Sequence, residues 1–197
     1  MKKLLTTLAV TALLSACAGG MQNTSMSAAP MAAEQSVSPV MVGGAPMYST
    51  KDIIDNAVNS KDHTTLVAAV KAAGLVDTLK TAGPFTVFAP TNAAFDALPA
   101  GTVPTLLKPE NKATLTKVLT YHVVAGRVDA AALGRMIAAG GGRATLKTVS
   151  GGMLYATMSG SNVIIADEKG GMATVTIANV YQSNGVIHVV NKVLLPA

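Results

Sequence analysis

Three histidines, His63, His122 and His188, are the side chains best suited to acid–base chemistry or metal binding at neutral pH. They lie far apart in the sequence, and none belongs to a cluster of residues at metal-ligand spacing. His122 ends an apolar stripe that begins at Leu115, and His188 lies within the apolar run Val186–Val190, so both are predicted to be buried core residues. His63 stands at a helix start and is predicted to be solvated. The histidines therefore predict no metal site.

Nucleophilic catalysis is not predicted either. The stretch Phe85–Leu98 has the pattern of a strand that turns into a short helix, and Thr91 is suited to cap that helix through its hydroxyl. A nucleophile elbow needs Ser, Cys or Asp at such a corner with glycines beside it, which Pro90-Thr91-Asn92 does not provide. The glycines 140–142 lack the flanking residues of a phosphate-binding loop and predict a flexible loop. Ser, His and Asp side chains can still meet in space, but the sequence predicts no enzyme and no cofactor.

The first residues have the pattern of an export signal. Lys2 and Lys3 precede the apolar run Leu4–Leu14, which is shorter than the ~20 residues that span a bilayer. The run ends at Leu14-Ser15-Ala16-Cys17, which resembles a bacterial lipoprotein box; residues 1–16 would then be the signal peptide, and Cys17 would carry the lipid. Because Ala18 follows instead of Asp, this resemblance implies the outer membrane and leaves open the periplasmic or surface face. Cys17 is the only cysteine, so a hydrophobic core must hold the exported domain without a disulfide.

Residues 17–46 are predicted to be the lipidated cysteine and a flexible tether. Ala, Ser, Gly, Met, Pro and Gln dominate the segment, Glu34 is its only charge, and no helix or strand period persists. Its methionines suggest a Cu(I) site as an alternative, because thioethers are soft ligands. They are widely spaced and the segment has no histidine: Met21, Met26, Met31, Met41 and Met47. A spacer is the stronger interpretation.

Residues 47–197 show helical patterns first and strand patterns later. After a capping-box pattern at Ser49–Asp52, apolar periodicity predicts four helices, at Ile53–Val58, Asp62–Ala73, Asn92–Leu98 and Glu110–His122, and a short turn at Val76–Lys80. Following the early strand Phe85–Ala89, β-branched runs predict strands at Ala144–Val149, Met153–Met158, Asn162–Ala166, Ala173–Val180 and Val186–Leu194. Short turns between the late strands indicate hairpins. The fold class is therefore predicted to be α+β with an antiparallel sheet.

Three motifs of this segment resemble those of the fasciclin domain family. They are the box Phe85–Leu98, the central pair Tyr121-His122 and the box Gly185–Pro196, in that order. The resemblance covers residues 47–197 and implies a fasciclin-like domain, with N-terminal helices packed on an antiparallel β-wedge of about seven strands. Within the boxes, the resemblance implies structural signature positions at Thr91, Phe95, His188 and Asn191.

The family also implies a candidate ligand site. In animal matrix members the Tyr-His pair is implicated in integrin binding, which makes Tyr121 and His122 candidate adhesion residues here. Helical geometry places Tyr121 about 120° from the apolar stripe, so its hydroxyl is expected at the surface. A role for the pair in holding the fold is the favoured alternative.

Charge and family together limit the function. The formal net charge of +5 falls to 13 − 10 = +3 without Lys2 and Lys3, which suits weak attraction to anionic glycans or lipid head groups. Export and the scarcity of aromatic residues exclude a nucleic-acid partner. We expect a non-catalytic lipoprotein, bound to the membrane through Cys17, that interacts with a protein or glycan on a cell surface or matrix. The alternative is a periplasmic accessory factor for small-molecule binding, envelope stress or docking on a membrane complex.

Overall fold

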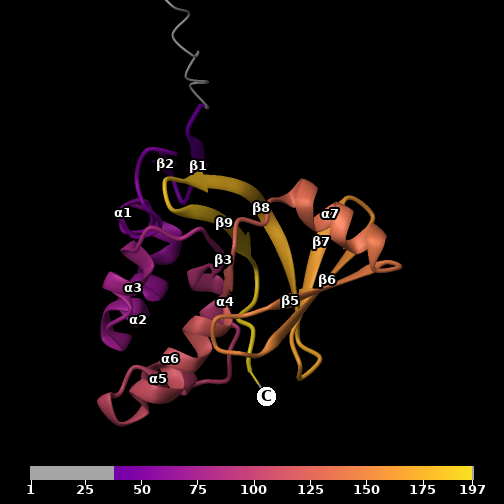
Figure 1. Ribbon diagram of the computed structural model, residues 1–197. Helices are drawn as coiled ribbons and strands as arrows, with labels where there is room; N and C mark the ends of the chain where they lie inside the picture. The colour runs from indigo at the N-terminus through magenta and orange to yellow at the C-terminus, as the bar shows by residue number, and fades with distance from the viewer. Residues whose placement is uncertain (1–37, 197) are drawn as a thin grey trace, which may run out of the picture. The chain divides into compact units, whose positions relative to one another are not determined.

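A seven-stranded sheet organises the part of the chain that this computed structural model describes, residues 38–196 (Figure 1). Its strands follow the order β4-β3-β9-β8-β7-β6-β5. Their bounds are β3 Phe85–Pro90, β4 Val123–Ala125, β5 Arg143–Lys147, β6 Met153–Ser159, β7 Asn162–Ala166, β8 Met172–Gln182 and β9 Gly185–Val190. Residues 37–197 make up one compact unit by themselves. The predicted α+β class with about seven strands is confirmed.

One strand pair differs from the predicted antiparallel sheet. The two box strands, β3 and β9, pair in parallel, with Phe88 opposite His188, while all other neighbours in the sheet are antiparallel. A parallel pair needs a long crossover, and about a hundred residues of helices and strands separate β3 from β9. Short turns indicate only strands that pair as antiparallel hairpins, so they could not indicate this parallel pair.

The two ends of the sheet nearly meet. Val124 of β4 forms a bridge with Thr148, which directly follows β5, and the Val149 N–H donates to the Val123 carbonyl at 2.8 Å. The sheet therefore almost closes on itself, and the predicted strand at 144–149 ends two residues early because the chain turns away to make this contact.

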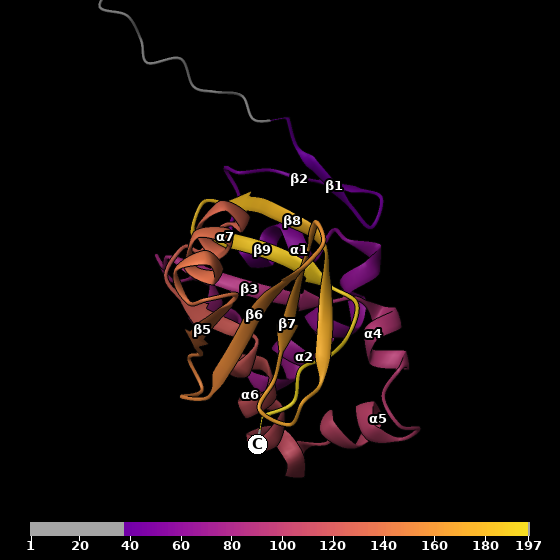
Figure 2. The same ribbon diagram turned by 90° about the vertical axis from the view of Figure 1, so that its right-hand side faces the viewer.

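Helices cover the sheet in two groups. Figure 1 shows α1 to α6 gathered beside β3, and α7 lying separately over β5 to β7; Figure 2 shows α7 apart from α2 and α6 in the turned view. The bounds are α1 Ile53–Ala57, α2 Thr64–Ala73, α3 Val76–Lys80, α4 Asn92–Asp96, α5 Thr102–Leu106, α6 Lys112–Tyr121 and α7 Ala130–Ala139, with 3-10 turns at Lys61–His63 and Pro109–Asn111. Asp52, not Ser49, caps α1, because its carboxylate accepts the Asp55 N–H at 2.8 Å. Helix α7 was not predicted, and neither was α5 or the short β4.

The predicted tether, residues 17–46, extends too far towards the C-terminus, because its last residues form strands. Strands β1 (Val40–Val42) and β2 (Ala45–Met47) pair as an antiparallel hairpin, which buries Val42 and Met47. Their packing outweighs a Gly- and Pro-containing composition that is unfavourable for strands. The expected signal peptide 1–16, Cys17 and the tether up to residue 37 lie outside the described residues.

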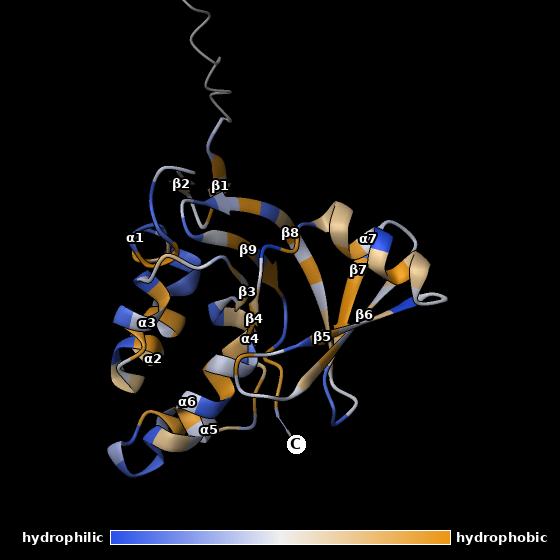
Figure 3. Ribbon diagram, viewed as in Figure 1, coloured by the Kyte–Doolittle hydropathy of each residue, from blue (hydrophilic) through white to orange (hydrophobic). Residues whose placement is uncertain are grey.

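Two apolar clusters fill the space on either side of β3 and β9. The helix-side cluster includes Val42, Ile54, Leu66, Val87, Ala89, Leu115, Leu119, Ile187 and Val189. The strand-side cluster includes Phe88, Tyr121, Leu133, Ile137, Leu154, Ile165, Val190 and Leu194. Figure 3 shows the apolar residues on β6, β7 and α7 that enclose the second cluster. All six residues of β9 are buried, which confirms the strand that was predicted to be covered on both faces.

Within residues 38–196, no helix has the length and apolar character needed to cross a bilayer.

Candidate functional site

Tyr121 is fully buried, so the expectation of a surface hydroxyl is wrong. Its hydroxyl donates to the Met153 carbonyl at 2.7 Å and accepts the Glu168 N–H at 3.1 Å. A Cβ on Gly152 would meet the Tyr121 ring, which shows how closely the ring is enclosed. Burial raises the pKa of this phenol, so it stays neutral. Tyr121 thus ties the end of α6 to β6 and to the turn after β7.

His122 lies in the core, as the apolar stripe predicted. Its Nδ1 lies 2.8 Å from the Val118 carbonyl, which can only accept, so Nδ1 carries the proton. Its Nε2 is then free to accept the Leu194 N–H at 2.9 Å. Burial lowers the pKa of His122 to about 4, so the ring is neutral near pH 7.

The adjacent pair therefore holds the C-terminal segment in place. The Leu194 side chain belongs to the strand-side cluster, and the next residue, Leu195, donates its N–H to Asp167 at 3.0 Å. Tyr121 reaches the same turn through Glu168. These contacts support the favoured role of Tyr121 and His122 in holding the fold. Direct contact with a ligand stays a prediction, and neither side chain is exposed for it.

The remaining signature residues also have structural contacts. Thr91 caps α4 by accepting the Ala94 N–H, as predicted, and Phe95 is buried in the helix-side cluster. His188 is fully buried, stacks on Phe88 at 5.6 Å between ring centroids and donates from Nε2 to the Val128 carbonyl.

Asn191 is exposed but still joins two strands. Its side-chain oxygen accepts the Thr174 N–H at 2.8 Å, and its own N–H donates to the Thr174 carbonyl. It therefore fixes the chain just after β9 against β8.

His63 is buried, so its predicted solvation is wrong. It is the last residue of the 3-10 turn Lys61–His63, which lies against the hairpin β1–β2: the Lys61 N–H donates to the Gly43 carbonyl there. Its Nδ1 lies 2.9 Å from the Ser60 hydroxyl, an arrangement that also occurs in serine nucleophiles with a histidine base. Ser60 is 1% exposed, however, and Nε2 of His63 has no partner that would orient the ring. Burial lowers the pKa of His63 as well.

The three histidines remain separate in space as well as in sequence. Within the described residues, no group of three His, Cys, Asp or Glu side chains is placed to hold a metal ion. Their hydrogen-bond partners differ: Ser60 for His63, Val118 and Leu194 for His122, and Val128 for His188.

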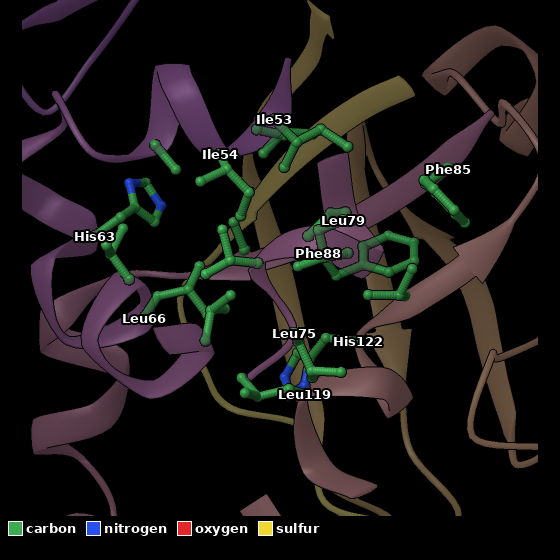
Figure 4. A pocket seen from close by; sticks show the side chains of 18 of the residues that line it. Ile53, Ile54, His63, Leu66, Leu75, Leu79, Phe85, Phe88, Leu119 and His122 are labelled. Carbon is green, nitrogen blue, oxygen red and sulfur yellow. The ribbon is translucent and has the colours of Figure 1, made fainter. Parts of the chain in front are cut away.

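An apolar pocket lies between the helices α1 to α3 and the strands β3 and β9, and sequence reasoning did not identify it. Figure 4 shows His63 and His122 at different points of its wall, with Leu66, Leu79 and Phe88 between them. Its lining comes from helices and strands far apart in the sequence and includes Met47, Ile53, Ile54, Ala57, Leu66, Val70, Leu75, Leu79, Val87, Phe88, Leu119 and Ile187. Concave, mostly apolar sites with a few polar groups are the usual form of small-molecule sites.

Fold and sequence agree on the class of this protein. The chain belongs to the fasciclin domain family, whose sequence profile matches residues 61–196. Protein sll1483 of Synechocystis sp. is 47% identical over 79% of this chain and 79% of its own length. Cell surface glycolipoprotein MPB83 of Mycobacterium bovis is 31% identical over 85% of this chain and 70% of its own length.

A solved structure has the same fold. It is a FAS1 domain pair from the insect cell adhesion molecule Fasciclin I, with a TM-score of 0.53 and 20% identity over 71% of this chain and 45% of that one. The chain is therefore a fasciclin module.

Proposed function

We propose that this protein is a lipid-anchored module of the outer membrane that faces the cell exterior and binds a protein or glycan there. The single observation that carries the proposal is the combination of a lipoprotein box at Leu14–Cys17 with similarity, over most of the chain, to a cell surface glycolipoprotein. The lipid on Cys17 holds the module at the membrane, and the residues between Cys17 and β1 set its reach.

The partner contacts the outside of the module and not the Tyr121-His122 pair. Both side chains are buried, so the motif can affect a partner only through the surface that it holds in place. That surface includes the turn Asp167–Gly170 and the C-terminal residues from Lys192, both fixed by hydrogen bonds to the pair or its neighbours. Substitution of the pair then lowers binding by disturbing this surface.

The anchoring half of the proposal is tested by metabolic labelling with a palmitate analogue. The native chain incorporates the label and fractionates with outer membranes, whereas a Cys17→Ser variant does neither. Labelling that persists in the variant, or a native chain that stays soluble after cell breakage, contradicts the anchor.

The binding half is tested with residues 37–197 against a panel of matrix proteins, cell-surface glycans and whole cells. Binding above that of an unrelated lipoprotein domain supports the proposal. The variant Leu194→Ala tests whether the partner uses the surface that the pair holds in place. It loosens the C-terminal segment, leaves most of the remaining surface unchanged, and should therefore lower binding. Absence of binding across the panel, combined with co-purification of the native protein with a periplasmic complex, favours the accessory role instead.

A further inference from the structure

The apolar pocket under helices α1 to α3 has one charged group at its edge. Among its lining residues in the described part of the chain, Lys71 is the only one with a permanent charge, and no carboxylate takes part. The lining is exposed to solvent at Lys71, Thr78 and Val149, and buried at residues such as Ile53, so the pocket opens on the side of these three. Lys71 makes none of the ion pairs found among residues 38–196.

The interior offers little to a polar guest. Both ring nitrogens of His122 are already hydrogen-bonded, to Val118 and Leu194. The Nε2 atom of His63 has no partner and is the remaining polar atom of note, at the opposite part of the wall (Figure 4). An apolar guest therefore gains contacts here, while a polar one loses hydrogen bonds to water.

The size of the pocket limits how many heavy atoms of a guest it can enclose. The cavity has a volume of about 60 Å³, within a depression that measures about 970 Å³ when space open to solvent is counted. One water needs about 10–15 Å³ of such a cavity, so the cavity holds a group of about four to six heavy atoms. An unbranched alkyl tail is the simplest group with this volume and no polar atom.

We propose that the pocket binds the tail of a small anionic amphiphile, a straight-chain carboxylate whose head group lies at Lys71. The tail occupies the space beneath α1 to α3, and the carboxylate remains in solvent at the mouth, where the ammonium group attracts it. This ligand site is independent of the lipid on Cys17 and of the protein or glycan partner proposed above.

Chain length gives the sharpest test. Each methylene that leaves water for the pocket increases affinity about fourfold, corresponding to the ~0.8 kcal/mol of a buried CH₂. Methyl ¹³C NMR of residues 37–197, titrated with n-alkyl carboxylates from butanoate to dodecanoate, should show this factor until about five tail carbons are enclosed and a much smaller factor beyond. Shifts should concentrate on lining methyls such as Leu66, Leu79 and Leu119.

Head-group controls test the role of Lys71. An alkyl trimethylammonium of equal chain length should bind several-fold more weakly than the carboxylate, and the alcohol should lie between them. Lys71→Gln should reduce carboxylate affinity about two- to fivefold and abolish the preference over the alcohol, as expected for an exposed charge pair. Lys147→Gln, an exposed lysine on β5 outside the lining, is the matched control and should change neither.

A substitution that fills the pocket with a larger side chain tests whether the carboxylate binds there. Ala57 lines the pocket from α1, and Ala57→Leu should abolish binding while circular dichroism shows that the domain remains folded. If that variant does not fold, Ala57→Val should lower the affinity for the longest carboxylates first. The proposal is overturned if affinity does not depend on chain length, if the ammonium binds as well as the carboxylate, or if shifts appear only with phosphatidylglycerol vesicles.

Discussion

The neutral, buried state of His122 should make the stability of the domain depend on pH. Its pKa is about 4 in the folded protein, against 6.5 for an ordinary histidine, because burial opposes the charge. Well above pH 6.5 the ring is neutral in both states and its hydrogen bonds contribute fully to stability. As the pH falls from 6.5 towards 4, the unfolded state binds a proton that the folded state does not, so the free energy of unfolding decreases. The difference of about 2.5 pKa units corresponds to a loss of about 3 kcal/mol by pH 4.

This effect can be isolated by comparison with His122→Gln. Urea denaturation of residues 37–197, followed by circular dichroism because the chain has no tryptophan, gives the free energy of unfolding between pH 7 and pH 4. At pH 7 the variant should be less stable by ~1–3 kcal/mol, because buried partners lose their hydrogen bonds. That gap should shrink by about 3 kcal/mol at pH 4, since only the native protein loses stability through this ring.

A control variant separates the proton from the packing. Leu194→Val loosens the same segment without removing the imidazole, so its stability should be lower than that of the native protein by a similar amount at every pH. His63 and His188 also have pKa values lowered by burial, but they titrate in all three proteins and cancel in the comparison. A stability difference between native protein and His122→Gln that stays constant from pH 7 to pH 4 would refute the assigned state of His122.

Further substitutions test the packing. Tyr121→Phe removes a hydroxyl with two part-buried backbone partners and should lower the free energy of unfolding by ~1–3 kcal/mol, whereas no change would mean that the hydroxyl is solvated. Gly134→Ala, in open space on α7, should raise stability by ~0.5–1 kcal/mol in urea denaturation. Gly185→Ala should lower it by at least about 2 kcal/mol, because its Cβ would collide with the Phe85 carbonyl oxygen; equal effects of the two glycine changes would contradict the β3–β9 pairing. Deletion of residues 38–48 removes three buried side chains, Val42, Ala45 and Met47, and should cost about 3 kcal/mol, measured by thermal unfolding; an unchanged midpoint would mean that the hairpin does not stabilise the domain.

Local patterns predicted the elements whose boundaries depend on local chemistry. Thr91 caps α4 because its hydroxyl accepts the Ala94 N–H, as its residue type and position predicted. Gly74, which directly follows the predicted helix Asp62–Ala73, ends α2 with a positive φ of 72°. Strand β7 has the predicted bounds Asn162–Ala166, because turn residues at both ends mark it.

Errors arose where an element packs on two sides or depends on a distant segment. The prediction for α6 assumed that only the face with the apolar stripe is buried. Two faces are buried, because Leu119 lies in the helix-side cluster and Tyr121 in the strand-side cluster. His63 is buried because a hairpin covers its turn, and that hairpin had been assigned to the tether. Helix α7 was missed because it contains Gly134 and adjoins a glycine run, although Leu133 and Ile137 lie four residues apart on its buried face. The pocket could not be predicted, since segments from Val42 to Ile187 enclose it.

The most direct test of the central claim is protease treatment of intact cells that express the native chain or Cys17→Ser. If the module is lipid-anchored at the cell exterior, the protease should remove the native domain while a periplasmic marker protein stays intact, and the Cys17→Ser protein should be protected inside or absent from the envelope. A native domain that survives treatment of intact cells, but is degraded after the outer membrane is permeabilised, would place it in the periplasm and contradict the proposed outward-facing interaction module.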